Sequence, residues 1–305
     1  MIYTVTFNPA VDYVVQLDQF HQGEVNRSKY DYKEAGGKGI NVSRVLRRLG
    51  LASDALGFAG GFTGKFVTDF LNEEKITHHF IELEEDTRIN VKWKANEIET
   101  EVNGKSPTIT NAHYEQFTEM LKKLQDGDIV VLAGSLPQSL QTDTYRTLVK
   151  MLHEHNVKVF LDTSGLALAE AIKAGPFFVK PNHHELAELF QEKVETEKDI
   201  IRLAKRLQEE YHIAHVLISM AGDGAIYVNG EASYKLTAPK GEVVHSVGAG
   251  DSAVAGFLYK WHETNNGVHA ATYAIASGSA TAFSETLCIK EEVESLLQEV
   301  HVSEL

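Results

Sequence analysis

The stretch Val244–Phe257, VHSVGAGDSAVAGF, places a glycine-rich turn between an apolar segment and a helix-forming one. We interpret Val243–Val247 as a strand, and the apolar spacing after Asp251 predicts an amphipathic helix. Gly248 and Gly250 permit a close backbone approach, and the first amides of a helix have no partner within it. The sequence therefore predicts a strand, a turn that can cradle a phosphate, and a helix, which together form a unit of an α/β fold.

Asp251 follows this turn directly and is the candidate catalytic residue. At or near the helix N-cap, its carboxylate is close enough to a cradled phosphoryl group to accept a proton from an attacking hydroxyl. Aspartate is also a favoured N-cap residue, so the turn alone supports a purely structural role equally well. The turn is not a dinucleotide fingerprint, because Ala253 stands where the third glycine of G-x-G-x-x-G would be, and the sequence contains no Walker A loop.

Short apolar runs alternate with helix-period segments over most of the chain, which predicts βαβ units around a mainly parallel sheet. The clearest predicted strands are Asp128–Gly134, Val157–Asp162, Phe177–Lys180 and His215–Ser219. Segments of about 11–34 and 87–106 break this alternation, and apolar residues at every second position of 88–95 indicate strands with one solvated face. No linker or repeat divides the sequence, so we expect one domain, 1–305, in which these two segments form a small β lid.

The bulk composition of the 305 residues limits the classes of partner and of site. A hydrophobic content of 43% is ample for a packed core, and a net charge of −14 argues against a nucleic-acid partner or an anionic membrane surface. The sequence lacks a long apolar run and the features of a signal peptide, so we expect a cytoplasmic protein. The single cysteine, Cys288, excludes an internal disulfide, and the 14 histidines show no metal-ligand spacing.

A second glycine-rich stretch, Ala35–Gly50, opens a helix far upstream of the first. Its apolar face is predicted to be buried, and Gly50 stands where helices commonly end. Lys38 and Asn41 offer a cation and an amide to a small polar ligand resting on the glycine backbone. A tight connection between a strand and a helix would explain the glycines but would leave Lys38 and Asn41 without a task.

The two glycine-rich stretches, about 200 residues apart, together resemble the paired signatures of the ribokinase-like sugar kinases, phosphofructokinase B branch. The resemblance spans the chain and includes the motifs Asn8–Asp12, Thr87–Lys92, Gly134–Pro137, Lys180–Glu185 and Ser219–Gly224. It implies a three-layer α/β sandwich with a mainly parallel central sheet and a small β-sheet lid. Within the family, the motifs look most like those of kinases that act on fructose 1-phosphate, with tagatose 6-phosphate as the alternative substrate.

This resemblance implies that ATP gives its γ-phosphoryl group to the C6 hydroxyl of fructose 1-phosphate. Asp251 would then be the catalytic base, and charge on the transferring group would be neutralised by the amides of Gly248, Ala249 and Gly250. Mg²⁺ on the nucleotide would be positioned, partly through water, by Asn182 and Glu185. A non-catalytic sugar-phosphate sensor with the same fold is the alternative from a different class.

The resemblance also implies which residues hold the two substrates. Asp12, Gly37 and Asn41 would grip the sugar hydroxyls. The sugar's own phosphate is expected at Arg88, together with Lys38, Asn90 and Ser135, whereas Arg27 and Lys92 are either further contacts or exposed lid cations.

Nucleotide binding is implied at a set of residues in the second half of the chain: Lys180, Asn182, Ser219, Gly222, Gly224 and Ser277. Two of these assignments have structural alternatives. Ser219–Gly224 also fits a hairpin turn, and the small residues of Ala274–Ala282 also fit close helix packing. Finally, an apolar side of the lid around Trp93 predicts a homodimer formed through the lids of two copies.

Overall fold

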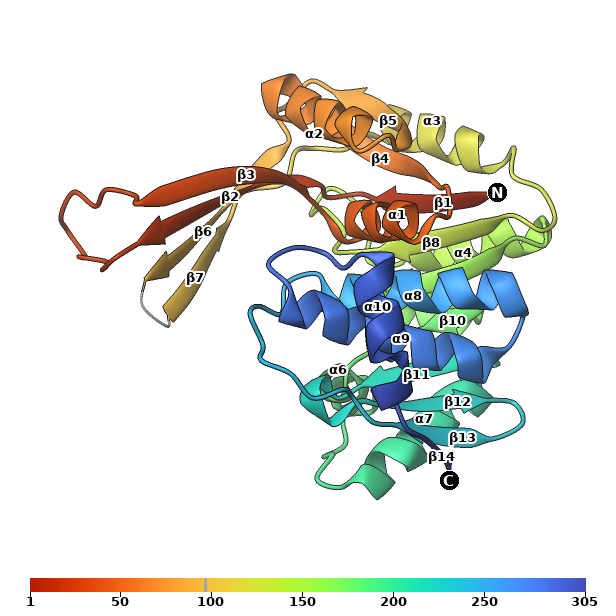
Figure 1. Cartoon of the computed structure of the whole chain (residues 1–305). Helices are drawn as coiled ribbons and strands as arrows, with labels where there is room; N and C mark the ends of the chain where they lie inside the picture. The colour runs from red at the N-terminus through yellow and green to blue at the C-terminus, as the bar shows by residue number, and fades with distance from the viewer. Residues whose placement is uncertain (96–97) are drawn as a thin grey trace.

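Ten strands form one sheet and four form a second, smaller one in the computed structural model, which describes residues 1–95 and 98–305 (Figure 1). The large sheet has the order β14-β13-β12-β11-β10-β9-β8-β1-β4-β5. Strands from β11 through β5 run parallel to their neighbours, and β12, β13 and β14 add antiparallel at one edge. The strands are β1 (Ile2–Thr6), β4 (Asp54–Gly60), β5 (Thr77–Leu83), β8 (Ile129–Ala133), β9 (Lys158–Asp162), β10 (Phe178–Val179), β11 (His215–Ser219), β12 (Ala225–Asn229), β13 (Ser233–Leu236) and β14 (Val302–Glu304).

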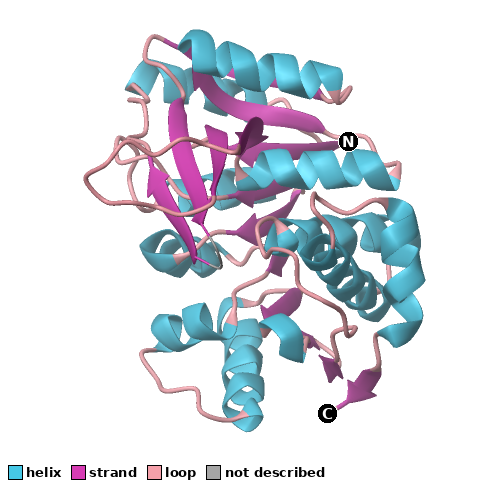
Figure 2. Ribbon diagram, turned by 60° about the vertical axis from the view of Figure 1, so that its left-hand side comes forward, coloured by secondary structure: helices cyan, strands magenta, loops and turns pink. Residues whose placement is uncertain are grey.

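Helices cover both faces of the large sheet and complete the predicted three-layer α/β sandwich (Figure 2). One face carries α3 (Asn111–Leu121), α4 (Thr144–Glu154), α5 (Gly165–Ala171), α6 (His183–Phe190) and α7 (Glu197–Tyr211). The other carries α1 (Lys38–Leu49), α8 (Ala249–Thr264), α9 (Gly267–Phe283) and α10 (Lys290–Leu296). Alternate residues of β8 enter the two cores, Val130 on one side and Val131 on the other, which explains its uninterrupted apolar sequence. In the described parts of the chain, no helix is both long and apolar enough to cross a lipid bilayer.

The four central strands predicted from the sequence are present with their boundaries shifted by a residue or two at most. His215–Ser219 is β11 itself, and Asp128–Gly134 contains β8. The predicted strand Val243–Val247 is wrong, because this segment has an irregular backbone. The Val244 amide donates to the carbonyl of Ala282 at the end of α9, so the segment runs beside a helix end and not beside a sheet edge, and its valines are exposed.

The small sheet consists of β2 (Ala10–Leu17), β3 (Tyr30–Gly36), β6 (Arg88–Ala95) and β7 (Ile98–Asn103), in the order β3-β2-β6-β7. It projects away from the large sheet (Figure 1) and joins it where β1 ends and β2 begins a few residues later. These strands fall in the two segments that interrupt the alternation, although residues 96–97 of the second segment lie outside the described residues. α2 (Gly61–Glu73) packs against the start of β2 and the end of β3 through Val67 and Leu71.

The alternation in β6 is present, but its polar side chains are the more deeply buried ones. Asn90 and Lys92 are buried, whereas Ile89 is exposed. Asn90 and Lys92 both contact Asp12 of the neighbouring β2, so their burial is compensated by hydrogen bonds and charge. The apolar face of the small sheet is therefore its outer face, and the polar face points toward the large sheet.

Two glycines allow a matched test of how the backbone conformation limits the sequence. Gly50 ends α1 with φ 91°, whereas Gly222, between β11 and β12, lies outside the left-handed region, and a Cβ atom at either position would meet nothing within 4 Å. We expect Gly50→Ala to lower the free energy of unfolding by about 1–2 kcal/mol, because L-residues are strained at positive φ. Gly222→Ala is expected to be neutral or to stabilise by up to about 1 kcal/mol. Urea denaturation of both variants checks this, and equal effects would contradict it.

Candidate active site

A cavity of about 360 Å³ lies at the carboxyl ends of β1 and β8, between the start of α1, the start of α8 and the small sheet. Ligands of open parallel sheets bind at such ends, because the loops that follow the strands converge there. The cavity brings together predicted site residues from distant parts of the sequence: Asp12, Gly37, Lys38, Asn41, Arg88, Ser135, Gly248 and Asp251. Arg27 is exposed in the connection between β2 and β3 and does not line this cavity.

The turn Gly248–Gly250 forms the start of α8. Gly248 is the N-cap residue with φ 79°, a left-handed conformation that favours glycine, and the Ser252 amide makes a helical hydrogen bond to its carbonyl. The amides of the first turn therefore point out of the helix, where the helix dipole favours an anion. A Cβ atom on Gly250 would lie 3.3 Å from the Lys180 ammonium nitrogen, so a cation stands directly beside this turn.

Asp251 lies in the first turn of α8 and is 6% exposed. Its Oδ2 accepts a hydrogen bond from Asn41 Nδ2 at 2.8 Å. Burial raises the pKa of Asp251 to about 6, with a further contribution from the negative charge of Asp162, while Lys38, the Asn41 hydrogen bond and Lys180 act in the opposite direction. A carboxylate with a pKa near 6 is ionised at neutral pH and yet holds a proton better than an ordinary aspartate.

Lys38 and Lys180 share one buried carboxylate, that of Asp162 at the end of β9. Lys38 Nζ donates to Asp162 Oδ2 at 3.2 Å, and Lys180 Nζ lies 3.4 Å from Oδ1. Burial opposes the ionisation of Asp162, but the charges of Lys180 and Lys38 outweigh it, and the pKa of Asp162 is below its ordinary value. In turn, Asp162 raises the pKa of Lys38. Asp162 thus fixes Lys180 beside the glycine turn and Lys38 in the adjoining cavity.

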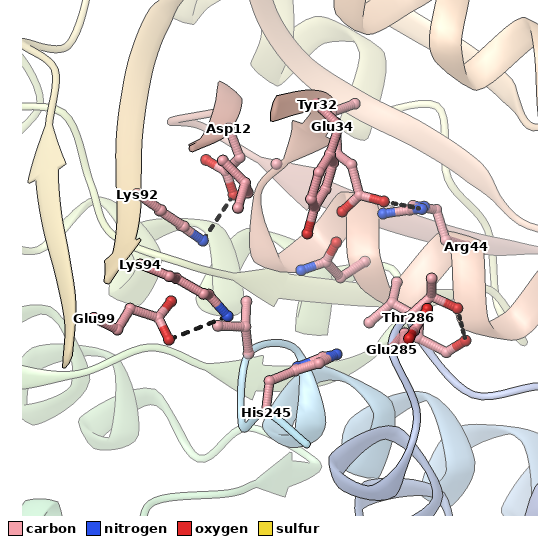
Figure 3. A pocket seen from close by; sticks show the side chains of 16 residues that line it. Asp12, Tyr32, Glu34, Arg44, Lys92, Lys94, Glu99, His245, Glu285 and Thr286 are labelled. Carbon is pink, nitrogen blue, oxygen red and sulfur yellow. Dashed lines mark hydrogen bonds and ion pairs between the residues drawn. The ribbon is translucent and has the colours of Figure 1, made fainter. Parts of the chain in front are cut away.

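Asp12 is held by two neighbours on β6. Asn90 Nδ2 donates to its Oδ1 at 2.9 Å, and Lys92 Nζ donates to its Oδ2 at 3.0 Å; Figure 3 shows Lys92 and Asp12 pointing toward one another. Burial alone would lower the pKa of Lys92, but Asp12 and then Glu101 outweigh it and raise the pKa. Gly36 lies so close that an added Cβ would approach the Asp12 carboxyl group to 2.6 Å. The carboxylate is therefore fixed in place on the polar face of the small sheet.

Three buried polar atoms facing the same cavity have no hydrogen-bond partner among the described residues. They are Thr6 Oγ1, Asn8 Oδ1 and Arg88 Nε. Arg88 is anchored by one terminal nitrogen, which donates to the Asn8 carbonyl at 3.1 Å, and Asn8 Nδ2 donates to Ser135 Oγ at 3.3 Å. Because buried polar groups are nearly always paired, this cluster has the character of a binding site for a polar or anionic ligand.

Asn182 and Glu185 form a capping box at the start of α6. The Glu185 amide donates to Asn182 Oδ1 at 2.9 Å, and the Asn182 amide donates to Glu185 Oε2 at 2.8 Å. Ser219 is paired with Asn182 through a backbone bridge, so both lie at the same end of the sheet. Residues 1–95 and 98–305 contain no cluster of three or more metal-binding side chains. The oxygen atoms of Asn182 and Glu185 are of the type that Mg²⁺ prefers, so these two residues fit an ion held mainly by phosphates and water.

A second cavity of about 600 Å³ lies between α6, the start of α7 and the β11–β12 connection, and Gly222 lines it. The connection is indeed a hairpin turn, as one interpretation of Ser219–Gly224 predicted, because β11 and β12 are antiparallel. The turn requires a glycine at position 224, because its φ is 91° and a Cβ atom there would lie 1.9 Å from the Leu236 carbonyl oxygen.

Ser277 does not reach either cavity, and its assignment to the nucleotide is wrong. It is fully buried between α8 and α9, and its hydroxyl donates to the carbonyl of Tyr273 at 2.8 Å. A Cβ atom on Gly256 of α8 would lie 2.3 Å from Ser277 Oγ. Close helix packing is therefore the correct interpretation of the small residues in Ala274–Ala282.

The sequence reasoning missed Thr6, Asn8 and Asp162 as site residues. All three lie at or just beyond the carboxyl end of a buried strand, β1 or β9. That position is itself a signal, because these strand ends meet at the ligand-binding edge of a parallel sheet. A search for polar residues directly after predicted apolar strands would have found them.

Comparisons with known proteins agree with this architecture. The model of the pfkB family of carbohydrate kinases matches residues 5–292. A protein of Bacillus subtilis strain 168 named 1-phosphofructokinase is 50% identical over 305 residues, covering 100% of both chains. A protein of Staphylococcus epidermidis strain RP62A named tagatose-6-phosphate kinase is 36% identical over 84% of both.

The fold has an equally extensive match among solved structures. The crystal structure of phosphofructokinase-2 from Escherichia coli in complex with substrates and products superposes with a TM-score of 0.93 at 26% sequence identity, covering 98% of both chains. Sequence and fold thus agree over nearly the whole length. The chain belongs to the pfkB family of carbohydrate kinases, and it has a ribokinase-like fold.

Proposed function

We propose that this kinase transfers the γ-phosphoryl group of ATP to the C6 hydroxyl of fructose 1-phosphate, producing fructose 1,6-bisphosphate and ADP. The observation that carries the proposal is the position of Asp251: a buried carboxylate with a raised pKa, in the first turn of a helix whose amides face the cavity that Asp12 and Arg88 also line. The 50% identity to the B. subtilis protein named 1-phosphofructokinase supports the choice of sugar phosphate.

In this reaction Asp251 is the general base. As the C6 oxygen bonds to the γ-phosphorus, its proton passes to Asp251 Oδ1, the oxygen that Asn41 leaves free, and the bond from the γ-phosphorus to the bridging oxygen of ADP breaks. The amides of Gly248, Ala249 and Gly250 donate to the oxygens of the transferring group, on which negative charge must be stabilised.

Asp12 orients the sugar, and Arg88 holds its phosphate. A fixed carboxylate accepts hydrogen bonds from two hydroxyls at once and so selects the orientation of the ring, with Gly37 and Asn41 on the same side. The unpaired Arg88 Nε, with Lys38, Asn90 and Ser135 nearby, suits the dianionic C1 phosphate, because a guanidinium fork binds two phosphate oxygens. Lys92 reaches Asp12 and not only solvent, which favours its role as a further contact.

The nucleotide is proposed to lie along Lys180, Asn182, Ser219, Gly222 and Gly224, with its phosphates toward the glycine turn. Lys180 is well placed for this, since its ammonium borders Gly250. Mg²⁺, when bound, supplies positive charge to the nucleotide phosphates, and Glu185 would orient its water ligands.

The proposed use of ATP supports a cytoplasmic location for the protein. The single cysteine, which cannot form an internal disulfide, is consistent with this location.

Tagatose 6-phosphate is the alternative substrate, supported by the 36% identity to the S. epidermidis protein named tagatose-6-phosphate kinase. A non-catalytic sugar-phosphate sensor is the less supported alternative. A sensor has no use for a buried base, and keeping Asp251 ionised in a buried position costs stability without improving sugar binding.

We also propose that two copies associate through the outer faces of their small sheets. Tyr13, Val15, Val91, Trp93 and Val102 share that face by strand register. Beside them, Phe20 stacks on Trp93 at 4.2 Å between ring centroids while remaining 42% exposed. An apolar sheet face of this kind is covered most simply by the same face of a second copy, related by a twofold axis.

Coupled assays with fructose 1-phosphate and tagatose 6-phosphate test the proposed reaction. We expect kcat/KM to be at least about tenfold higher with fructose 1-phosphate, the size of effect that one well-placed contact supplies. D-tagatose 1-phosphate belongs in the panel, because it carries its phosphate on the same carbon and differs in the configuration at C4. A higher kcat/KM with tagatose 6-phosphate would reverse the assignment.

Asp251→Asn is the control for these assays. We expect kcat to fall by about 10²-fold or more, with sugar-phosphate binding largely kept. The pKa of Asp251 is higher in the folded state than in the unfolded state, so its ionisation lowers the free energy of unfolding. This loss of stability is complete above about pH 6 and absent below about pH 4. The variant is therefore expected to melt no lower than the wild type at pH 8, which separates loss of catalysis from loss of structure. Unchanged turnover would end the assignment of Asp251.

The acid limb of kcat/KM gives a second test of the base. Activity should fall as the pH drops through about 6, because Asp251 becomes protonated. In Asn41→Ala the hydrogen bond that lowers this pKa is gone, so the midpoint should move to higher pH. Ser135→Ala lines the same cavity without contacting Asp251 and should leave the midpoint in place. The ionisation of the substrate phosphates is common to all three proteins, so identical midpoints would refute the role of Asp251.

Light scattering tests the association of two copies. At micromolar concentration we expect the wild type to have twice the chain mass, and Trp93→Glu to be monomeric, since a charge cannot be buried in that face without a partner. Leu166→Glu changes a similarly apolar, exposed residue on α5 and should leave the mass unchanged. A monomeric wild type would contradict the proposal.

A further inference from the structure

Asp162 pairs with two lysines that come from different elements around the proposed transfer site. It is the last residue of β9, and its side chain is 2% exposed. Its backbone is fixed as well, because its carbonyl accepts a hydrogen bond from the Gly134 amide at 2.9 Å. A carboxylate held this firmly defines the positions of the groups that pair with it.

The two oxygens of Asp162 serve different lysines. Oδ2 accepts a hydrogen bond from Lys38, the first residue of α1, and Oδ1 pairs with Lys180, which follows β10. Within residues 1–95 and 98–305, Asp162 is also the only carboxylate within 4.0 Å of the Lys180 ammonium nitrogen, which is itself buried. A buried cation with a single counter-charge depends on it, because an unpaired buried charge is strongly unfavourable.

Lys180 lies beside the glycine turn at Gly250, and Lys38 lies near Asp251 in the cavity that Asp12 also lines. Lysine side chains are long and flexible, and without Asp162 the two ammonium groups would spread over several rotamers. Their electrostatic interaction with a bound phosphate would then be weaker.

The charges near Asp251 are nearly balanced. Lys38, Lys180, Asp162 and Asp251 sum to zero, and the same cavity is lined from the small sheet by Arg88 and Lys92 against Asp12 and Glu101. When Asp251 accepts a proton, the first group of four becomes positive by one charge, at the moment when negative charge develops on the transferring phosphoryl group.

We propose that Asp162 is a positioning residue that holds the ammonium group of Lys180 beside the Gly248–Gly250 turn, where it meets the transferring phosphoryl group, and the ammonium group of Lys38 in the adjoining cavity that receives the sugar phosphate. The inference rests on the proposed kinase reaction. Asp162 itself touches neither substrate; it acts through the two lysines and through its charge on Asp251.

The test compares wild type with Asp162→Asn, Asp162→Glu and the control Asp128→Asn. Asp128 also makes an ion pair, with the N-terminal ammonium at 2.7 Å, but at the opposite end of the sheet. In Asp162→Asn we expect kcat to fall roughly 10²-fold, the usual cost of misplaced catalytic groups, and the midpoint of the acid limb of kcat/KM to move to lower pH. The negative charge of Asp162 raises the pKa of Asp251, so its removal should lower that pKa and, with it, the midpoint of the acid limb.

Asp162→Glu separates position from charge. It keeps the negative charge but moves the carboxylate by one methylene, so kcat should fall while the acid midpoint stays near that of the wild type. A merely structural role would reduce the amount of folded enzyme without moving any midpoint. Wild-type kcat and midpoint in Asp162→Asn, or a midpoint shifted to higher pH, would overturn the proposal.

A double-mutant cycle with Lys180→Met tests whether Asp162 acts through the lysine. The loss of kcat in the double variant should be clearly smaller than the product of the single losses, and multiplicative losses would refute the coupling. If Asp162→Asn does not fold, the same cycle is made with Asp162→Glu.

Calorimetric titration with ATP adds a readout that needs no turnover. We expect at least about tenfold weaker binding to Asp162→Asn and unchanged binding to Asp128→Asn, on the scale of a lost charge-assisted contact. A wild type that phosphorylates no sugar phosphate would defeat the proposed function, while equal ATP binding by wild type and Asp162→Asn would defeat the positioning role.

Discussion

The parallel pairing of β1 with β4 on one side and β8 on the other is the constraint on which the site depends. A parallel pair needs a crossover, so every loop that follows a central strand emerges at the same edge of the sheet. Asn8, Gly134 and Asp162 are near neighbours for this reason, although more than 100 residues separate the first from the other two. The cavity is thus a product of topology before any side chain is considered.

Three aspartates at this edge of the sheet have different electrostatic surroundings. Asp12 is held by an amide and an ammonium on the small sheet, and Asp162 is shared by two lysines. Asp251 has a hydrogen bond from Asn41 but no ion pair with any of the described residues. Their pKa values diverge accordingly: that of Asp162 is lowered and that of Asp251 is raised. The carboxylate that serves as a counter-ion and the carboxylate proposed as the base are distinguished by their neighbours and not by their residue type.

The sequence predicted the layers and many of the residues that line the cavity, because glycine turns and buried strands are local patterns. β11 is found at its predicted bounds, and Asp251 with Asn41 meet across two glycine-rich segments, each recognisable alone. The strand expected at Val243–Val247 was wrong because β-branched composition does not reveal whether a neighbouring strand edge exists. Ser277 was misassigned for a related reason, since small residues fit a ligand and a packed helix equally. Asp162 was missed because its importance arises only when two lysines from other elements reach it.

The small sheet carries Asp12 and Arg88, whereas Lys38, Asn41 and Asp251 belong to helices on the large sheet. In the proposed reaction, Asp12 and Arg88 on the small sheet therefore contact the sugar phosphate from one side of the cavity, and the base Asp251 faces it from the other. Substitutions on β2 or β6 would change the proposed sugar contacts of the small sheet and leave the helix that carries Asp251 unaltered. Such a division lets a lineage of enzymes drift from one substrate to another through a few exchanges in one small structural unit, without rebuilding the chemistry each time.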